Sequence, residues 1–135
     1  MKKKNEKILC IIPARSGSKG LRNKNFKRIK NIPLIGYTIN LAKKIKHIDK
    51  IFVSTDSKKI LNYAKKNECE APYLRPKKIS GDKSTIDEVC SNVLNYYKKI
   101  GENFDIILVL QPTSPLRKLN SLKKVVEKIL NNKNL

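Results

Sequence analysis

ILCIIPARSGSKG, residues 8–20, is the stretch that decides the fold class of this chain. Its first five residues are all apolar, which is typical of a β-strand buried on both faces, as in a parallel sheet. The apolar run ends at Pro13, and the residues that follow are small or basic and show no helical or strand periodicity. The sequence therefore predicts a buried strand that opens into a polar loop.

Apolar runs at residues 51–53 and 106–110 predict two more buried strands, and residues 71–75 predict a short extended piece. Segments with apolar residues at helical spacing alternate with these strands, and Pro33 is expected as a first helical residue. The predicted helices cover residues 33–46, a segment after a Ser57 cap, residues 86–97 after a Thr85–Glu88 capping box, and residues 122–130. This order predicts an α/β fold, a mainly parallel sheet with helices on both faces, built as a single domain over residues 1–135.

Ligands in such sheets bind beside the carboxyl ends of the strands, so we expect the functional site there. The loop at residues 14–25 leaves the first strand and combines small residues with Arg15, Lys19 and Lys24. Small residues let backbone N–H groups converge on an anion, and the basic side chains add positive charge. The loop contains neither G-x-x-x-x-G-K-[ST] nor G-x-G-x-x-G. On these residues alone, a polyphosphate site and a basic surface loop both stay open.

The net charge of +20, from 31 Lys and Arg against 11 Asp and Glu, raises the possibility of nucleic-acid binding. Arginine, the side chain that typically forms bidentate hydrogen bonds with base edges and phosphates, supplies only five of these positive charges. Many of the lysines occur as pairs, mostly on expected exposed helix faces, and there is no helix-turn-helix spacing, zinc ligand set or RNA-binding aromatic motif. We therefore expect a solvated basic surface and no nucleic-acid partner.

The three cysteines are scattered and form no C-x-x-C pair, and the one His of the chain cannot complete a zinc finger with them. This pattern favours reduced thiols in a cytoplasmic protein. No apolar run approaches the roughly 20 residues that a membrane helix needs, so no membrane partner is expected. The five-residue apolar run near the N-terminus is followed by charge instead of a cleavage site, so no targeting segment is expected.

A family resemblance rests on IIPARSGSKGLRNKN, which continues through NIPLIGYTI, IFVSTDS, LRP, SGDKST and LVLQPTSPLR. These motifs resemble, in order and from Ile8 to Arg117, those of the acylneuraminate (CMP-sialic acid) cytidylyltransferase family. The resemblance implies a Rossmann-like nucleotidyltransferase fold and an enzyme that couples CTP to an acidic nine-carbon sugar. The products would be a CMP-sugar for glycoconjugate biosynthesis and pyrophosphate, with Mg²⁺ as cofactor.

The same resemblance assigns roles to individual residues. It places Arg15 and Lys19 on the triphosphate as catalytic groups, Asn25 near the nucleoside, Arg75 on the cytosine and Gln111 near nucleotide and sugar. The remaining substrate-binding positions that it implies are Ser16, Ser18, Lys24, Ser84 and Ser114.

The residues themselves leave other interpretations open for some of these positions. Arg75 could be a surface side chain, while Gln111 and Ser114 could be turn formers around their neighbouring prolines. The position of Asp56, at the end of a strand beside Ser57, favours a role in bracing a loop or capping a helix over a role as a metal ligand.

The resemblance also implies that family members are longer than this chain. The resemblance implies that their later segments supply sugar contacts, a dimerisation region and metal-binding aspartates, so we expect the chain to correspond to an incomplete, C-terminally truncated nucleotide-binding part. The alternative to a complete enzyme is a fragment that binds CTP without turnover. The sequence leaves open whether the sugar is N-acetylneuraminic, legionaminic or pseudaminic acid, or the related eight-carbon acid Kdo.

Overall fold

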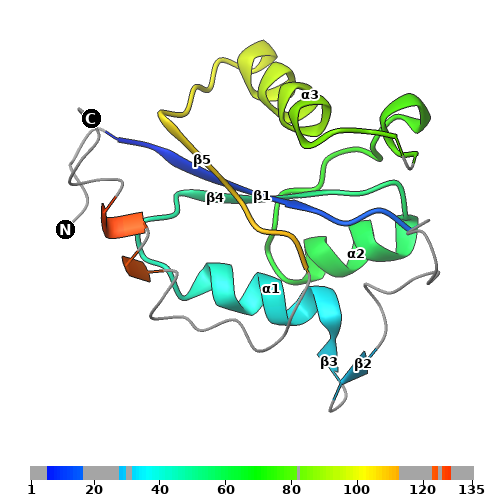
Figure 1. The fold of residues 1–135 in the computed structure, drawn as a ribbon, viewed down its shortest axis with the longest axis horizontal. Coiled ribbons are helices and arrows are strands. Elements are labelled where there is room, and N and C mark those ends of the chain that lie inside the picture. Colours follow the sequence, from blue (N-terminus) through cyan, green and yellow to red (C-terminus); the bar gives the residue numbers. More distant parts are fainter. Residues whose placement is uncertain are drawn as a thin grey trace.

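The computed structural model describes residues 6–16, 28–29, 32–81, 83–112, 123–124 and 126–128. Its main sheet has the order β4-β1-β5, with β1 (Ile8–Pro13) between β4 (Lys50–Ser54) and β5 (Ile106–Val109). Both neighbours run parallel to β1 (Figure 1). The parallel sheet that the apolar runs predict is therefore confirmed.

The register of the sheet brings the three strand ends to one edge. Pro13 of β1 is the partner of Ser54 in β4, and Ile11 is the partner of Val109 in β5. Hydrogen bonds from Ala14 N–H to the Ser54 carbonyl, at 2.9 Å, and from Leu110 N–H to the Ile11 carbonyl, at 3.0 Å, extend both pairings by one residue. The polar segments that follow all three strands therefore start side by side at the carboxyl edge of the sheet.

Alternate side chains of β1 face two different helical layers. Cys10 and Ile12 belong to a core that contains residues of α1 (Leu34–Lys43) and α2 (Lys58–Lys66). Leu9 and Ile11 belong to a second core with residues of α3 (Ile86–Lys99). In Figure 1 the helices α1 and α2 lie below the sheet and α3 lies above it. The prediction of helices on both faces is confirmed.

The predicted helix caps are present. The Ser57 hydroxyl accepts a hydrogen bond from the N–H of Ile60 at 3.3 Å at the start of α2. At the start of α3, the Thr85 hydroxyl accepts from the N–H of Glu88 at 3.1 Å, and the Glu88 carboxylate accepts from the N–H of Thr85 at 2.8 Å. These contacts satisfy N–H groups that the helix itself leaves without partners.

Three local predictions were wrong or incomplete. Strands β2 (Arg28–Ile29) and β3 (Ile32–Pro33) form an unpredicted antiparallel hairpin, so Pro33 ends a strand and α1 begins at Leu34. Two-residue strands are too short for a recognisable period. The expected extended piece at residues 71–75 is not a strand, and only Glu70 bridges to β4. Pro72 has no N–H to donate to a ladder. The short helix η2 (Lys77–Ile79) follows this segment.

The predicted last helix is described only in part. Lys123, Lys124 and residues 126–128 are helical, and Val126 packs into a small core with Ile8 and Ile45. Within the described ranges, the structure contains no helix long and apolar enough to cross a membrane.

Candidate nucleotide-binding site

Asp56, two residues after the end of β4, holds the start of the loop that leaves β1. One carboxylate oxygen accepts a hydrogen bond from the backbone N–H of Ser16 at 2.8 Å. The other carboxylate oxygen accepts from the Ser16 hydroxyl at 3.1 Å. Both contacts join positions 40 residues apart in sequence. The structure therefore shows Asp56 in the loop-bracing role that the sequence favours.

This pairing determines what Ser16 can offer to a ligand. A phosphate oxygen is an acceptor, so a residue that binds it must supply an N–H or O–H donor. Both donors of Ser16 already point at Asp56. In this arrangement Ser16 positions the start of the loop, and both of its donors are engaged by Asp56.

Arg75 is buried at the same edge, with 5% of its surface exposed. Its Nε donates to the Ser54 hydroxyl at 3.0 Å and its Nη2 donates to the Ser54 carbonyl at 2.7 Å. Its Nη1 donates to the Ile79 carbonyl at 3.4 Å, and its backbone N–H donates to the Thr55 carbonyl at 2.7 Å. Arg75 is therefore not a surface side chain; it ties the end of β4 to η2.

The charges at this edge act on one another. Burial lowers the pKa of Arg75, nearby Asp56 opposes that change, and nearby Arg15 reinforces it. Arg15, Asp56 and Arg75 thus share one electrostatic environment beside the first loop. Two guanidinium groups against one carboxylate leave this group of residues net positive, which suits an anionic ligand.

The other predicted positions are distributed unevenly. Gln111 is exposed immediately after β5 and Leu110, at the same carboxyl edge. Ser84 is half-buried in a turn before α3, where its N–H donates to the Gly81 carbonyl at 3.1 Å. Five predicted positions lie outside the described residues: Ser18, Lys19, Lys24, Asn25 and Ser114.

The sequence places Ser54 and Thr55 at this edge but assigns neither of them a role. Ser54 supplies two of the three acceptors for the Arg75 side chain, and the fully buried Thr55 hydroxyl accepts from the N–H of Ser57 at 3.0 Å. Their position in the sequence could have indicated a role, because these two hydroxyl residues follow an apolar strand at the carboxyl edge of the sheet.

The residues that the structure describes do not gather into a metal site held by protein ligands alone. Magnesium prefers several oxygen ligands, including one or two carboxylates. Among the residues that the structure describes, no three His, Cys, Asp or Glu side chains gather to hold a metal ion. Asp56 directs each of its oxygens at a donor of Ser16. The described residues therefore do not form a site that would hold Mg²⁺ by protein side chains alone.

Fold and site together define an α/β protein whose polar and basic groups converge at the carboxyl edge of a parallel sheet. A family model described as Cytidylyltransferase matches residues 9–135. The chain belongs to this family, which confirms the resemblance drawn from its motifs.

Curated relatives match most of this chain but only part of their own length. The CMP-N,N'-diacetyllegionaminic acid synthase of Legionella pneumophila is 38% identical over 90% of this chain and 52% of the relative. A pseudaminic acid cytidylyltransferase of Campylobacter jejuni is 35% identical over 93% of this chain and 54% of the relative. An N-acylneuraminate cytidylyltransferase of Escherichia coli is 40% identical over 82% and 25%. The chain thus spans about half of the first two relatives.

Solved structures share the fold at lower sequence identity. A CMP:2-keto-3-deoxy-manno-octonic acid synthetase complexed with CTP superimposes with a TM-score of 0.79 and 20% identity, over 96% of this chain and 50% of that chain. A cytidylyltransferase from Leptospira borgpetersenii superimposes with a TM-score of 0.72 and 24% identity, over 96% of this chain and 51% of that chain. The Rossmann-like nucleotidyltransferase fold is therefore established for this chain.

Proposed function

We propose that this chain is the nucleotide-binding part of a cytidylyltransferase that activates an acidic nonulosonic sugar with CTP. The family match over residues 9–135 carries the proposal. The site supports it chemically, because Arg15 and Arg75 make the carboxyl edge basic and Asp56 fixes the start of a small-residue loop. A fold alone would not suffice, since one fold serves many chemistries.

In the proposed reaction, a sugar hydroxyl attacks the α-phosphorus of CTP. The new phosphorus–oxygen bond makes the CMP-sugar, and the bond from the α-phosphorus to the oxygen of the β-phosphate breaks. Pyrophosphate leaves with the electron pair of that bond, and the hydroxyl proton passes to water or to a phosphate oxygen. Arg15 and Lys19 would neutralise the triphosphate, Arg as a fork and Lys as a mobile point charge. Positioning and charge neutralisation are the main contributions that a protein makes to such a displacement.

Other chain residues would shape the nucleotide pocket. Asn25 is proposed near the nucleoside and Gln111 near nucleotide and sugar. Arg75 is proposed beside the cytosine, where its contacts with Ser54 and Ile79 would hold it in one orientation. Mg²⁺ stays the expected cofactor, with its ligands proposed in the part of the relatives that this chain does not span.

The sugar class is proposed from the named activities of the relatives. Legionaminic, pseudaminic and N-acylneuraminic acids are all acidic nine-carbon sugars, and relatives named for each match this chain at 35–40% identity. We propose a nonulosonic acid without choosing among the three. A soluble CTP pool and soluble sugar acid would place the reaction in the cytoplasm.

A second candidate is CTP binding without turnover by these 135 residues alone. The observation that favours it is the coverage of about half of the relatives, together with the absence of a metal-holding cluster among the described residues. A chain without aligned metal and sugar would keep the affinity for nucleotide and lose most of the rate.

The test is pyrophosphate release from CTP with a panel of N-acetylneuraminic, pseudaminic, legionaminic and Kdo acids. It is run alongside calorimetric titration of CTP and of a DNA duplex at two salt concentrations. Release with one nine-carbon acid supports the enzyme, whereas CTP binding without release supports the second candidate. Tight, salt-dependent DNA binding without CTP binding would contradict both.

A further inference from the structure

Two pairs of lysines beside the carboxyl edge of the sheet have no role in the proposed reaction. One pair begins α2 and the other begins η2, and all four side chains are exposed. These residues, which we call the basic rim, are Lys58, Lys59, Lys77 and Lys78. The carboxylates nearest to them in sequence are Asp56, whose two oxygens accept from Ser16, and Asp82, which lies outside the described residues.

Contacts at the end of β4 place both pairs beside the proposed nucleotide site. Asp56, which accepts from the first loop at 2.8 Å, comes two residues before Lys58. In Figure 1 the first turn of α2 lies beside the carboxyl end of β1. The other pair belongs to η2, where the Ile79 carbonyl accepts from the buried Arg75 at 3.4 Å. Arg75 also donates to Ser54 at the end of β4, so η2 and the start of α2 both flank this strand end.

The lysines of α2 occupy positions where a helix favours the opposite charge. The N-terminus of a helix carries a partial positive charge, which stabilises Asp and Glu in the first turn and destabilises Lys there. Helix α3 follows this rule, with Asp87 and Glu88 in its first turn and Lys98 and Lys99 in its last. Helix α2 begins with two lysines of the basic rim and has no acidic residue in its first turn. These two charges therefore do not serve the stability of α2.

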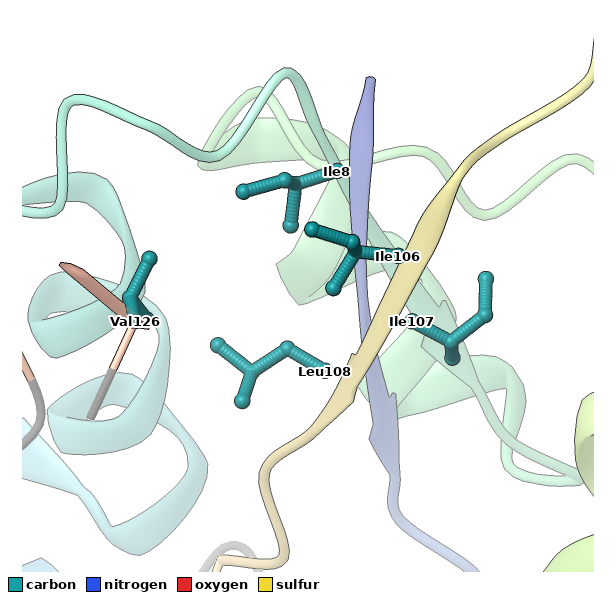
Figure 2. A pocket seen from close by; sticks show the side chains of 5 residues that line it. All are labelled: Ile8, Ile106, Ile107, Leu108 and Val126. Atoms are coloured by element: carbon teal, nitrogen blue, oxygen red, sulfur yellow. The ribbon is translucent and has the colours of Figure 1, made fainter. Parts of the chain in front are cut away.

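Two hollows away from this edge do not suit an anionic ligand. One of them is lined by aliphatic side chains (Figure 2), namely Ile8, Ile106, Ile107, Leu108 and Val126. The other contains three carboxylates and two lysines, namely Asp49, Glu68, Glu70, Lys43 and Lys50. Its lysines are paired, because Lys43 lies 3.8 Å from Glu68 and Lys50 lies 3.6 Å from Glu70. Neither hollow would attract a polyanion as the basic rim would.

We propose that the basic rim attracts the triphosphate of CTP by its charge and speeds the association of the nucleotide with the site. The inference rests on the proposed function and adds residues that the reaction itself does not use. Charges of one sign at the entrance of a site raise the local concentration of an oppositely charged ligand, and salt weakens this effect. Such exposed charges act mainly on the association rate and less on the dissociation rate.

The test measures both rate constants by stopped flow, with a CTP that carries a fluorescent label on its ribose. The variants K58E/K59E and K77E/K78E each reverse two charges of the basic rim. At about 10 mM salt, where charges act over roughly 30 Å, each variant should associate at least about 5-fold more slowly than the original chain. Near about 1 M salt, where the range is roughly 3 Å, this difference should nearly disappear. The dissociation rate constants should change less than about 2-fold.

The variant K98E/K99E is the matched control, because it reverses two exposed lysines and has the same net charge as each rim variant. These lysines end α3, and the nearby Glu102 pairs with Lys50 at the start of β4, at the opposite edge of the sheet. The association rate of this control should stay within about 2-fold of the original. The melting temperature of K58E/K59E should exceed that of the control by roughly 2–8 °C, because only K58E/K59E improves the charge at a helix end.

An equal loss of association rate in K98E/K99E would overturn the proposal, because net charge alone would then explain the rate. Rim variants that associate as fast as the original chain at low salt would overturn it too. So would a K58E/K59E variant less stable than the control, because its lysines would then serve the helix.

Calorimetric titration of inorganic tripolyphosphate separates this proposal from the proposed function. Tripolyphosphate that binds as tightly as CTP, and less tightly to the rim variants at low salt, would support the basic rim and contradict a site for cytidine nucleotides. A chain that binds neither ligand would overturn both.

Discussion

Asp56 and Ser16 form a two-point contact in which both donors of Ser16 meet the two oxygens of one carboxylate, at 2.8 Å and 3.1 Å. The contact links the carboxyl end of β4 to the loop that leaves β1. A loop rich in glycine and serine loses much conformational entropy when it is ordered. Fixing Ser16 near the start of the loop would reduce that cost for any loop residue that binds the proposed phosphates.

Asp56→Asn is expected to weaken CTP binding although Asp56 itself need not touch the nucleotide. The asparagine side chain keeps one oxygen that can accept from Ser16, but its NH₂ group then faces the other donor of Ser16. One half-buried polar group is left without a hydrogen-bond partner, which costs about 1–3 kcal/mol. CTP affinity, measured by calorimetry, should fall roughly 5- to 150-fold.

Ser16→Ala is the comparator, because it removes only the hydroxyl contact and keeps the backbone one. It should cost less than Asp56→Asn, and the double variant should cost less than the sum. Additive effects would show that the two residues act separately and would remove Asp56 from the loop-positioning role.

Lys19→Ala tests the first loop as the triphosphate site. A charge-assisted hydrogen bond contributes about 1.5–3 kcal/mol, so CTP affinity should fall by roughly 10- to 150-fold. Lys44→Ala is the matched control, because Lys44 is exposed in a turn after α1, and should leave the affinity unchanged. An unaltered affinity in Lys19→Ala would exclude Lys19 from the site.

Arg75→Lys is expected to destabilise the fold and the site together. A lysine ammonium cannot reproduce the fork that reaches the Ser54 hydroxyl, the Ser54 carbonyl and the Ile79 carbonyl. Urea unfolding should show a loss of about 1–3 kcal/mol, the cost of leaving buried polar groups unsatisfied.

The exposed neighbour Lys77 provides the control, since Lys77→Ala should leave the free energy of unfolding unchanged. If Arg75→Lys is as stable as the original chain, the buried guanidinium does not hold η2 to the end of β4.

The pH dependence of stability should report an ion pair at the opposite edge of the sheet. Lys50 Nζ lies 2.6 Å from a carboxylate oxygen of Glu102, and this hydrogen bond lowers the pKa of Glu102 below its ordinary 4.5. A lowered carboxyl pKa contributes stability that is present above the unfolded-state value and is lost as the pH falls through the folded-state value. Part of the stability should therefore disappear below about pH 4.5.

Glu102→Gln should flatten that acid limb of the stability curve, measured as the urea midpoint between pH 6 and pH 3. The same hydrogen bond raises the pKa of Lys50 above 10.5, so at alkaline pH its contribution is lost only as the pH rises through that higher value. Equal acid sensitivity in Glu102→Gln and the original chain would show that other carboxyl groups control the acid limb.

Much of this fold follows from local sequence, because its strands are apolar runs and its helices carry caps and helical periodicity. Ile8–Ile12, the Ser57 cap and the Thr85–Glu88 box are all signals that depend on neighbouring residues. The hairpin of β2 and β3 escaped notice because two-residue strands carry no period. Pro72 and Pro76 suggested an extended piece that, without a donor at Pro72, does not become a strand.

The site was harder to predict because its contacts join distant residues. Nothing near Arg75 in sequence shows that Ser54, 21 residues earlier, would receive its guanidinium. The pairing of Ser16 with Asp56 depends on the register of β1 against β4, which places two loops beside each other. The residue types correctly indicated the carboxyl edge of the sheet as the site. Only the fold shows which of these residues form hydrogen bonds with one another.

The most direct test of the central claim is calorimetric titration of the 135-residue chain with CTP and with ATP under identical salt conditions. The account predicts that CTP binds and that ATP binds at least about 10-fold more weakly, because a pocket that hydrogen-bonds one base edge rejects a purine of different size and pattern. Equal binding of CTP and ATP, or no binding of CTP, would contradict a cytidine-nucleotide site at the carboxyl edge of this sheet.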